Sequence, residues 1–467
     1  MPVRPIFASV VLALFAASVS QSIVAPALPR IVDDLGGMRH YSWIATSTLL
    51  AAAVVIPLAG KLSDVYGRRP VYVTGLLVFA FGSALSGLAQ SFWWLVAARG
   101  VQGVGIGATL ALSQVVIGDI MSPRERGRYQ GYLGSSFGLA AVIGPLVGGW
   151  LTDNLSWRWC FFVNLPLVAA ALVVSLIYLR LPVSGARGPL DVRGIVALAG
   201  GLTALLLAVS LVGAPEPFGW PLLAGLAVLA GGLFVAFAAD ERRAADPVLP
   251  ARLLRDPVFR ATALAGLLVA VTMFGATFFI PLFAQGVLGE DATRSGVLLV
   301  PLAVGLVISS TIVGRLITRT GSYKWFMLGG GVLIAAGWAL LARLGVDSTS
   351  RDIAVALVLV GAGLGATTQN FVLVVQNRAS SDDMGIATAS AQLFRSLGAT
   401  LGVAGLGSVF ASRLSREPED GAGIAAALHP LFVAGLGVAI AAVAAIALIR
   451  RVPLRETPGV VAPPHLS

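Results

Sequence analysis

A short break between two apolar stretches reads Gly-Lys-Leu-Ser-Asp-Val-Tyr-Gly-Arg-Arg-Pro, over residues 60–70. Gly60 lets two helices approach each other closely, and Gly67 permits a tight turn. Asp64 can accept hydrogen bonds from a helix N-terminus or from an arginine. An ordinary basic loop requires neither this acid nor both glycines, so the pattern predicts a latch that breaks and re-forms between moving parts. The predicted latch residues are Gly60, Asp64, Gly67, Arg68 and Arg69.

The composition around this break indicates a membrane protein. Of 467 residues, 57% are hydrophobic and 12% are charged, and the mean hydropathy is +0.89, whereas about a quarter of an ordinary soluble domain is charged. Apolar stretches of roughly twenty residues recur from end to end, each long enough to cross a bilayer as a helix. Strands of a membrane barrel would instead alternate at every second residue. We therefore expect an all-α polytopic protein with about fourteen transmembrane helices, near residues 6–30, 42–62, 71–90, 93–119, 129–152, 159–181, 192–213, 218–239, 258–285, 293–317, 325–344, 352–376, 385–411 and 428–450.

The net charge of +10 does not indicate nucleic-acid binding, because lysine and arginine lie mostly in short breaks between apolar stretches. Counted in alternate breaks, they divide roughly three to one, and the richer set includes Arg68, Arg69 and Arg126. Positive charge in short loops is retained on the cytoplasmic face. The pattern predicts a multi-pass protein of the bacterial inner membrane with both termini in the cytoplasm.

A degenerate second copy of the latch loop indicates that the chain has two related halves. It extends from Gly314 to Gly321, with Thr318 where the first copy has its acid. Internal repeats of this kind are common in membrane transport folds. We expect an N-terminal six-helix bundle over residues 1–185, an inserted transmembrane hairpin over 186–240, a cytoplasmic connection over 241–257, a C-terminal six-helix bundle over 258–455 and a cytoplasmic tail over 456–467.

An arginine lies inside the predicted span near residues 93–119. The stretch from Arg99 to Ala108 reads Arg-Gly-Val-Gln-Gly-Val-Gly-Ile-Gly-Ala, and its glycines allow close backbone packing. An unpaired charge at this depth costs several kcal/mol, so Arg99 must face protein or water. It either changes the proton affinity of a neighbour as the surroundings hydrate, or it ties its helix to polar partners.

The span near residues 129–152 carries a second small-residue pattern. Glycines at four-residue spacing form a smooth helix face, and a proline bends the helix because it lacks a backbone donor. Plain helix packing explains the same spacing. The residues of this pattern are Gly144, Pro145, Gly148 and Gly149.

Together these motifs resemble the major facilitator superfamily, and in particular its fourteen-helix drug:proton antiporter branch. The likeness extends over nearly the whole chain and includes the run from Trp157 to Pro166. It implies a fold of two six-helix bundles that rock in alternating access, with an intramembrane arginine associated with proton coupling. It also ties the glycine-proline motif of residues 144–149 to export rather than uptake.

One position departs from the pattern of that branch. Its members usually carry an aspartate in the first helix, and here Ser20 occupies the place and cannot titrate. Asp33 and Asp34 follow at the outer mouth, where they either collect protons or are simply solvated. The proton-coupling candidates are Arg99, Asp33 and Asp34.

Polar side chains within the spans are candidates for a substrate cavity. Each is more often packing than contact, but as a set on facing helices they suit neutral or weakly polar ligands, and Arg395 would favour an anionic group. The candidates are Ser20, Gln21, Gln102, Gln114, Gln369, Asn370, Gln392 and Arg395.

These observations favour transport and not catalysis. The sequence has no phosphate-binding Gly-x-x-x-x-Gly-Lys-Ser/Thr run, and three histidines with the single Cys160 leave little for a metal site. We expect a monomer in the bilayer that exports lipophilic small molecules, including drugs and antibiotics, in exchange for protons, with a proton gradient and no cofactor. Two alternatives stay open: a dedicated exporter of one natural product or lipid with weak or no proton coupling, and a non-transporting sensor or scaffold.

Overall fold

The structure is a computed structural model that describes residues 3–120, 123–179, 192–211, 220–241, 253, 255–378, 384–416 and 420–450. Every element in these ranges is a helix. The elements are α1 (Val3–Ser22), η1 (Ala25–Ala27), α2 (Leu28–Leu35), η2 (Met38–His40), α3 (Trp43–Tyr66), α4 (Arg68–Gly87), α5 (Phe92–Ile120), α6 (Pro123–Asn154), α7 (Trp159–Phe162), α8 (Asn164–Tyr178), α9 (Val192–Leu211), α10 (Trp220–Glu241), α12 (Pro257–Gly286), α13 (Ala292–Thr320), α14 (Lys324–Leu341), α15 (Ser350–Arg378), α16 (Met384–Leu414) and α17 (Gly421–Leu448).

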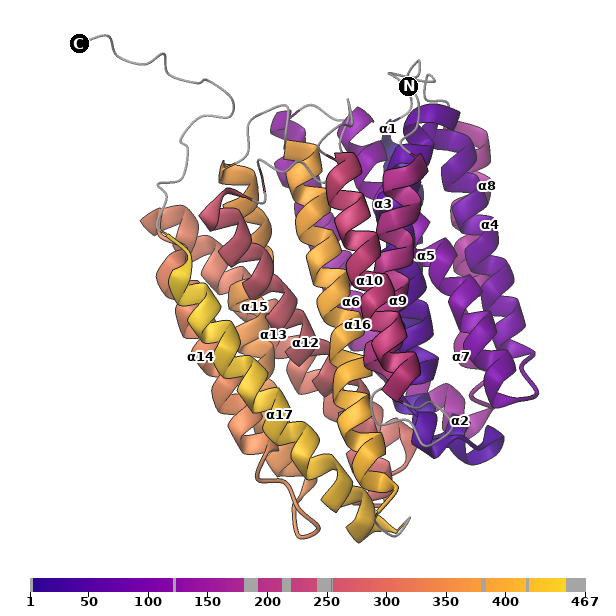
Figure 1. Cartoon of the computed structure of the whole chain (residues 1–467), viewed down its shortest axis with the longest axis vertical. Helices are drawn as coiled ribbons and strands as arrows, with labels where there is room; N and C mark the ends of the chain where they lie inside the picture. The colour runs from indigo at the N-terminus through magenta and orange to yellow at the C-terminus, as the bar shows by residue number, and fades with distance from the viewer. Residues whose placement is uncertain are drawn as a thin grey trace.

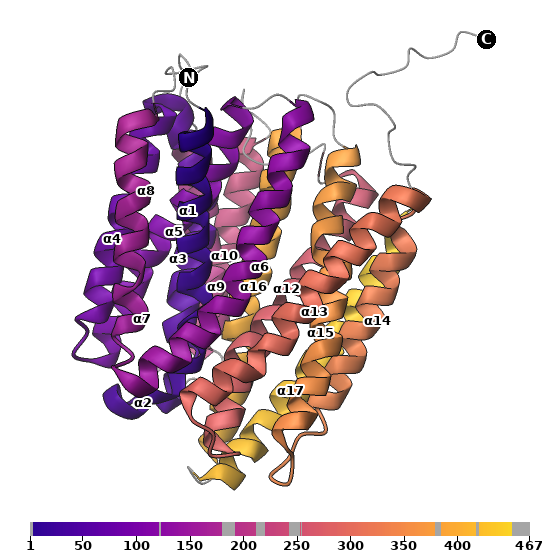
Figure 2. The ribbon, with the colours of Figure 1, turned by 180° about the vertical axis from the view of Figure 1, so that it is seen from behind.

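The helices form two bundles that stand side by side (Figures 1 and 2). In the N-terminal bundle α5 packs against α3 and α4, and α1 packs against α6 and α8. In the C-terminal bundle α15 packs against α13 and α14, and α12 packs against α16 and α17. α1 begins and α17 ends at one end of the molecule, which we call the terminal side. α6 ends and α13 begins at the opposite end, the far side.

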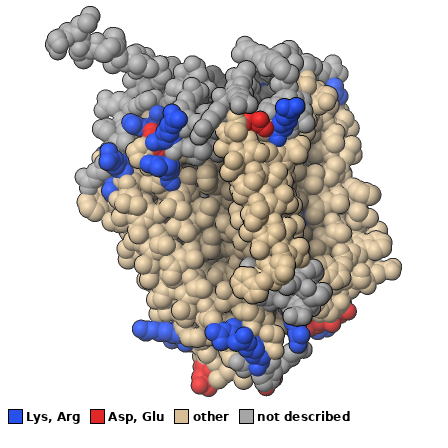
Figure 3. Space-filling model, in the orientation of Figure 1, with Lys and Arg blue, Asp and Glu red and all other residues tan. Residues whose placement is uncertain are grey.

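Charged residues gather at these two ends. In Figure 3 lysine, arginine, aspartate and glutamate lie near the top and bottom of the visible face, and a broad band of other residues separates them. Large apolar side chains are exposed between the ends, among them Val228 of α10 and Ile440 of α17. Such a band matches the hydrocarbon core of a bilayer, in which only backbone groups bonded within the segment are stable.

Among the described residues, twelve helices are long and apolar enough to cross a membrane. The expected count of about fourteen is therefore not confirmed. The two helices outside the twelve are α6 and α9. The sequence of α6 begins with a charged stretch, residues 124–128, and α9 contains an apolar helix of only Val196–Val209.

The expected inserted hairpin of two spans is likewise not confirmed, because only α10 of the pair qualifies. α9 and α10 pack against each other, and α9 also contacts α3 and α16, one helix from each bundle. A small apolar cluster at this junction joins Leu198 and Leu202 to Leu393 of α16. α10 is mostly exposed, so the pair lies at the seam between the bundles, with α10 outermost.

The first predicted span is broken and not continuous. α1 ends at Ser22, a turn of 3₁₀ helix follows, and α2 then continues to Leu35. Pro26 and Pro29 cause the break, because each removes a backbone donor and disfavours regular α-helix before it. The last span begins seven residues earlier than predicted, at Gly421, since Asp420 caps it through a bond from the Gly423 N–H.

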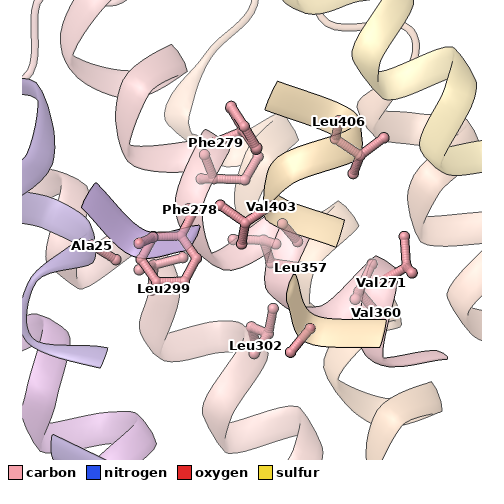
Figure 4. Close-up of a cluster of buried hydrophobic side chains, with 14 of the residues drawn as sticks. Ala25, Val271, Phe278, Phe279, Leu299, Leu302, Leu357, Val360, Val403 and Leu406 are labelled. Atoms are coloured by element: carbon pink, nitrogen blue, oxygen red, sulfur yellow. The ribbon is translucent and has the colours of Figure 1, made fainter. Parts of the chain in front are cut away.

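The main apolar core joins both bundles, and within the C-terminal bundle it continues to the terminal side, where it includes Tyr323 and Ile449. It combines Ile23, Ala25 and Leu28 from the N-terminal half with residues of α12, α13, α15 and α16. Figure 4 shows part of this cluster, with Ala25 of η1 on the side of Phe278 and Leu299. Close packing of this kind holds helices together in lipid, where the solvent is as apolar as the side chains.

Candidate functional site

Arg99 of α5 is buried among neutral polar groups in the N-terminal bundle. Only 1% of the residue is exposed. Its Nε donates a hydrogen bond to the Ile44 carbonyl at 3.2 Å, and its Nη1 donates to Oε1 of Gln102 at 2.6 Å. Arg99 and Gln102 are three residues apart, so both lie on one face of α5. The guanidinium also lies 5.7 Å from the centre of the Phe161 ring.

The Gln102 amide connects Arg99 to two hydroxyl groups on neighbouring helices. Its Nε2 donates to Ser20 Oγ of α1 at 3.1 Å and to Ser83 Oγ of α4 at 2.7 Å. All four side chains are buried. We call Ser20, Ser83, Arg99 and Gln102 the buried polar cluster. It joins three helices of one bundle through side-chain bonds.

Glycines bring the helices of this cluster together. A Cβ added at Gly82 would lie 2.5 Å from the Gln102 Cα, and one added at Gly103 would lie 2.9 Å from the Thr48 Cα. Real Cβ atoms do not approach other atoms so closely, so any larger residue would separate α4 or α3 from α5. The predicted close packing matches the contacts at Gly103, but a Cβ added at Gly60 or Gly100 would meet no atom within 4 Å, so the expected close approach is absent at these two glycines.

The charge of Arg99 has no carboxylate partner among the described side chains. Its bonds go to a carbonyl and an amide oxygen, both of which carry only partial charge. Ser20, at the place where the related branch usually has an acid, reaches Arg99 through Gln102. The departure seen in the sequence therefore falls at a position that bonds to Gln102 and not directly to Arg99.

The structure brings three sequence candidates together, namely Ser20, Gln102 and Arg99. Ser83 was missed, because a serine in an apolar span has no signal that separates it from a packing residue. Asp33 and Asp34 lie elsewhere: both are exposed at the far-side end of α2, and Asp34 Oδ2 accepts a bond from Trp157 Nε1 at 2.8 Å.

The glycine-proline motif of α6 lies at contacts with α1 and α13. A Cβ at Gly144 would lie 2.9 Å from Ser22 Cβ, and a Cβ at Gly149 would lie 2.7 Å from Thr293 Cα. Gly148 faces the Ile23 carbonyl, and the Pro145 carbonyl faces Gly296 of α13. The motif thus packs α6 within its own bundle and against the other bundle.

The predicted latch residues make their described bonds inside the N-terminal bundle. Arg68 Nη1 donates to Ser63 Oγ at 2.6 Å, and Arg69 Nη2 donates to the Leu176 carbonyl at the end of α8 at 2.7 Å. Gly67 has a φ of 92°, as the predicted tight turn requires. The side chains of Asp64 and Thr318 lie outside the described residues, so the role of the acid stays a prediction.

The remaining cavity candidates are dispersed. Gln21 and Gln392 are half-buried, Gln369 is exposed, and the Asn370 amide donates to the Ala366 carbonyl of its own helix at 2.8 Å. No described hydrogen bond joins these four to the buried polar cluster. Arg395 is half-buried on α16, and the Gln114 side chain lies outside the described residues. In the part of the chain that the structure describes, no group of three or more metal-ligating side chains occurs.

A family profile described as "Major Facilitator Superfamily" matches residues 10–403. The chain belongs to the major facilitator superfamily. This superfamily member is 36% identical over 408 residues to "Multidrug transporter protein MdtP" of Bacillus subtilis, covering 86% of the chain and 74% of that protein. It is 31% identical over 409 residues to "Multidrug resistance protein 3" of the same organism, and the match covers 88% of the chain and 80% of that protein.

A mycobacterial relative is longer. The superfamily member is 40% identical over 418 residues to "Uncharacterized MFS-type transporter Rv1877" of Mycobacterium tuberculosis, which covers 89% of the chain and 61% of that protein. Its fold is similar to that of the human organic anion transporter MFSD10, with a TM-score of 0.63, 18% identity, and 96% and 100% of the two chains covered. The fold is also similar to that of a bacterial homologue of the human lysosomal transporter Spinster, solved in an inward-facing and occupied conformation. The TM-score is 0.64 and the sequence identity is 15%, and the match covers 95% of this chain and 96% of that chain.

Proposed function

We propose that this protein is a secondary active exporter of lipophilic small molecules, including drugs and antibiotics, that works by alternating access in exchange for protons. The single observation that supports it most is the buried polar cluster, which places the charge of Arg99 inside the hydrophobic layer. A charge held there at a cost of several kcal/mol is characteristic of coupling sites. The protein would use a proton gradient, with no cofactor, and would act as a monomer.

The helix motif and the relatives support export. The glycine-proline motif packs α6 against α13, at a contact between the bundles that must change if they rock. Two relatives with more than 30% identity carry multidrug names. We further propose that α6 and α9 also cross the bilayer, as in the fourteen-helix branch, and that the terminal side faces the cytoplasm of a bacterial cell.

The experiment is dye efflux from proteoliposomes with and without an imposed proton gradient. Wild type should show gradient-driven efflux, and Arg99→Ala should reduce its rate by about ten-fold or more, since ten-fold corresponds to roughly 1.4 kcal/mol on a barrier. Arg343→Ala is the matched control, because Arg343 is exposed at the far side and makes no described side-chain bond to the cluster. Equal rates for wild type and Arg99→Ala at equal incorporation would refute the proposed role.

A dedicated exporter with weak or no proton coupling is the second candidate, and Ser20 is the observation that favours it. Relatives also include a transporter of the Acurin A biosynthesis cluster of Aspergillus aculeatus. Ser20→Asp distinguishes the two, since it would place a carboxylate beside Gln102. If only Ser20→Asp responds to the gradient, the wild-type protein is the uncoupled exporter. If wild type already responds, the acid in the first helix is not required.

A further inference from the structure

On the far side, Asp153 at the end of α6 bonds to the start of α13 in the other bundle. Its Oδ1 accepts from the Ala292 N–H at 3.3 Å, and its Oδ2 accepts from the Thr293 N–H at 2.6 Å. The Thr293 hydroxyl also donates to Oδ2. A carboxylate of one bundle thus caps a helix of the other, about 140 residues further along the chain.

The first N–H groups of a helix have no partner within it, and its dipole favours a negative charge at this end. α13 has its own N-cap, Asp291, whose Oδ1 accepts from the Arg294 N–H at 2.6 Å. Asp291 therefore accepts the hydrogen bond of the third N–H group of the helix. The first two N–H groups, those of Ala292 and Thr293, bond to Asp153 instead. The two carboxylates divide the first turn, so the bond from Asp153 is not redundant.

Other polar bonds cross between the bundles at the same end. Gln285 Nε2 of α12 donates to the Pro26 carbonyl of η1 at 2.8 Å, and the Tyr41 hydroxyl donates to the Phe278 carbonyl at 2.9 Å. Gly149 packs against Ala292 and Thr293 next to the cap. The far side is therefore closed by apolar packing together with these directed bonds.

We propose that Asp153 is the latch of a far-side gate: its bond to α13 stabilises the conformation in which the bundles are closed on that side. The cap must break when α6 and α13 separate. The proposal rests on alternating access in the proposed function. The latch expected from the sequence, residues 60–70, lies on the terminal side. The two latches would therefore hold opposite sides of the molecule closed, each in a different conformation of the transport cycle.

The test is a distance measurement between spin labels by pulsed electron paramagnetic resonance. Cys160→Ser removes the single buried thiol, and labels at Leu155→Cys and Val346→Cys then report on the far side. Both positions are exposed, one in each bundle. Wild type should give one dominant short distance. Asp153→Asn and Asp153→Ala should raise the long-distance population about ten-fold relative to the short one, as expected for loss of charge-assisted bonds.

Two variants keep the proposal falsifiable. Asp291→Ala removes a carboxylate from the same helix end without breaking a bond between bundles, so its distances should match wild type. Thr293→Val removes only the hydroxyl donor and should give a smaller shift in the same direction. Unchanged distances in monodisperse Asp153 variants, or an equal shift in Asp291→Ala, would overturn the latch. The labels need neither substrate nor gradient, so a failure of proton-coupled export would leave this result standing.

Discussion

At the scale of single residues, Gln102 is the member of the buried polar cluster on which the other three depend. It is the only described side chain that bonds both to Arg99 and to the two serines. Its amide can accept from Arg99 and donate to both hydroxyls at once, which neither a leucine nor a glutamate can do. Among the described residues, the positive charge of Arg99 is therefore stabilised by the dipoles of an amide and a carbonyl group and not by a carboxylate.

Replacing Gln102 should test this dependence. Gln102→Leu leaves Nη1 of Arg99 without its acceptor and should lower stability by about 1–3 kcal/mol, the cost of an unsatisfied buried polar group. Ser83→Ala removes one weaker bond and should cost less. Thermal unfolding in detergent, followed by tryptophan fluorescence, measures both. A loss no larger than that of Ser83→Ala would show that Gln102 does not stabilise Arg99.

At the scale of elements, the start of α12 is held by a cap that is also an ion pair. Asp256 Oδ1 accepts from the Val258 N–H at 2.7 Å, and Oδ2 accepts from Arg378 Nε at 2.9 Å, which ties α12 to the end of α15. Partial burial acts to raise the pKa of Asp256. The hydrogen bonds from Arg378 and from the Val258 backbone outweigh it, so the pKa lies below its usual value of 3.8.

The direction of this pKa shift fixes the pH dependence. A carboxyl whose pKa is lowered by folding stabilises the folded state above its unfolded pKa, here 3.8, and this contribution is lost as pH falls through the lower folded value. Asp256→Ala should thus cost about 1 kcal/mol at neutral pH, mostly from the cap, because the ion pair is half exposed. The difference from wild type should vanish in acid.

Two variants separate the cap from the pair. Arg378→Gln should cost only a few tenths of a kcal/mol. Asp420→Ala removes a cap that has no described ion pair and should resemble Asp256→Ala at neutral pH. Unfolding midpoints measured from pH 7 down to about pH 2 provide the comparison, because the contribution is lost only below the folded pKa. A difference between Asp256→Ala and wild type that persists below pH 3 would contradict the assigned cause.

Sequence alone predicted elements well where length and hydropathy decide them. The predicted span 258–285 is α12 to within a residue at each end, and 93–119 is α5. Prediction from sequence failed where proline residues or contacts with distant helices determine where a helix ends or what a residue does. Pro26 and Pro29 break the first span, and the apolar part of α9 is only Val196–Val209. Arg99 was visible as a charge in an apolar run, but Ser83 and Asp153 gain their roles only from partners on other helices.

At the scale of the whole molecule, one contact connects the chemistry of the cluster to the closing of the far side. α1 carries Ser20, which bonds to Gln102, and Ser22, whose hydroxyl donates to the Ala140 carbonyl of α6 at 2.9 Å. The next helix in this series is α13, which packs against α6. A continuous series of contacts therefore links Arg99 to the interface between the bundles.

The tight contact between α6 and α13 leads to a last prediction about the whole molecule. A Cβ at Gly296 would lie 3.0 Å from the Pro145 carbonyl carbon and closer still to its oxygen. Gly296→Val should therefore force the bundles apart on the far side, at a cost of about 1–3 kcal/mol from overpacking. Efflux should fall, and the label pair at residues 155 and 346 should report a longer distance.

Gly437 of α17 supplies the matched control, because a Cβ there meets no atom within 4 Å. Gly437→Val should keep wild-type efflux and far-side distance, and removing a helix-interior glycine should not destabilise α17. If the Gly296→Val protein shows wild-type efflux and a wild-type far-side distance, close contact between α6 and α13 is not required. The apolar core around Phe278 would then be what keeps the far side closed. If both variants lose efflux, added side-chain bulk in any helix, and not the contact between α6 and α13, explains the loss.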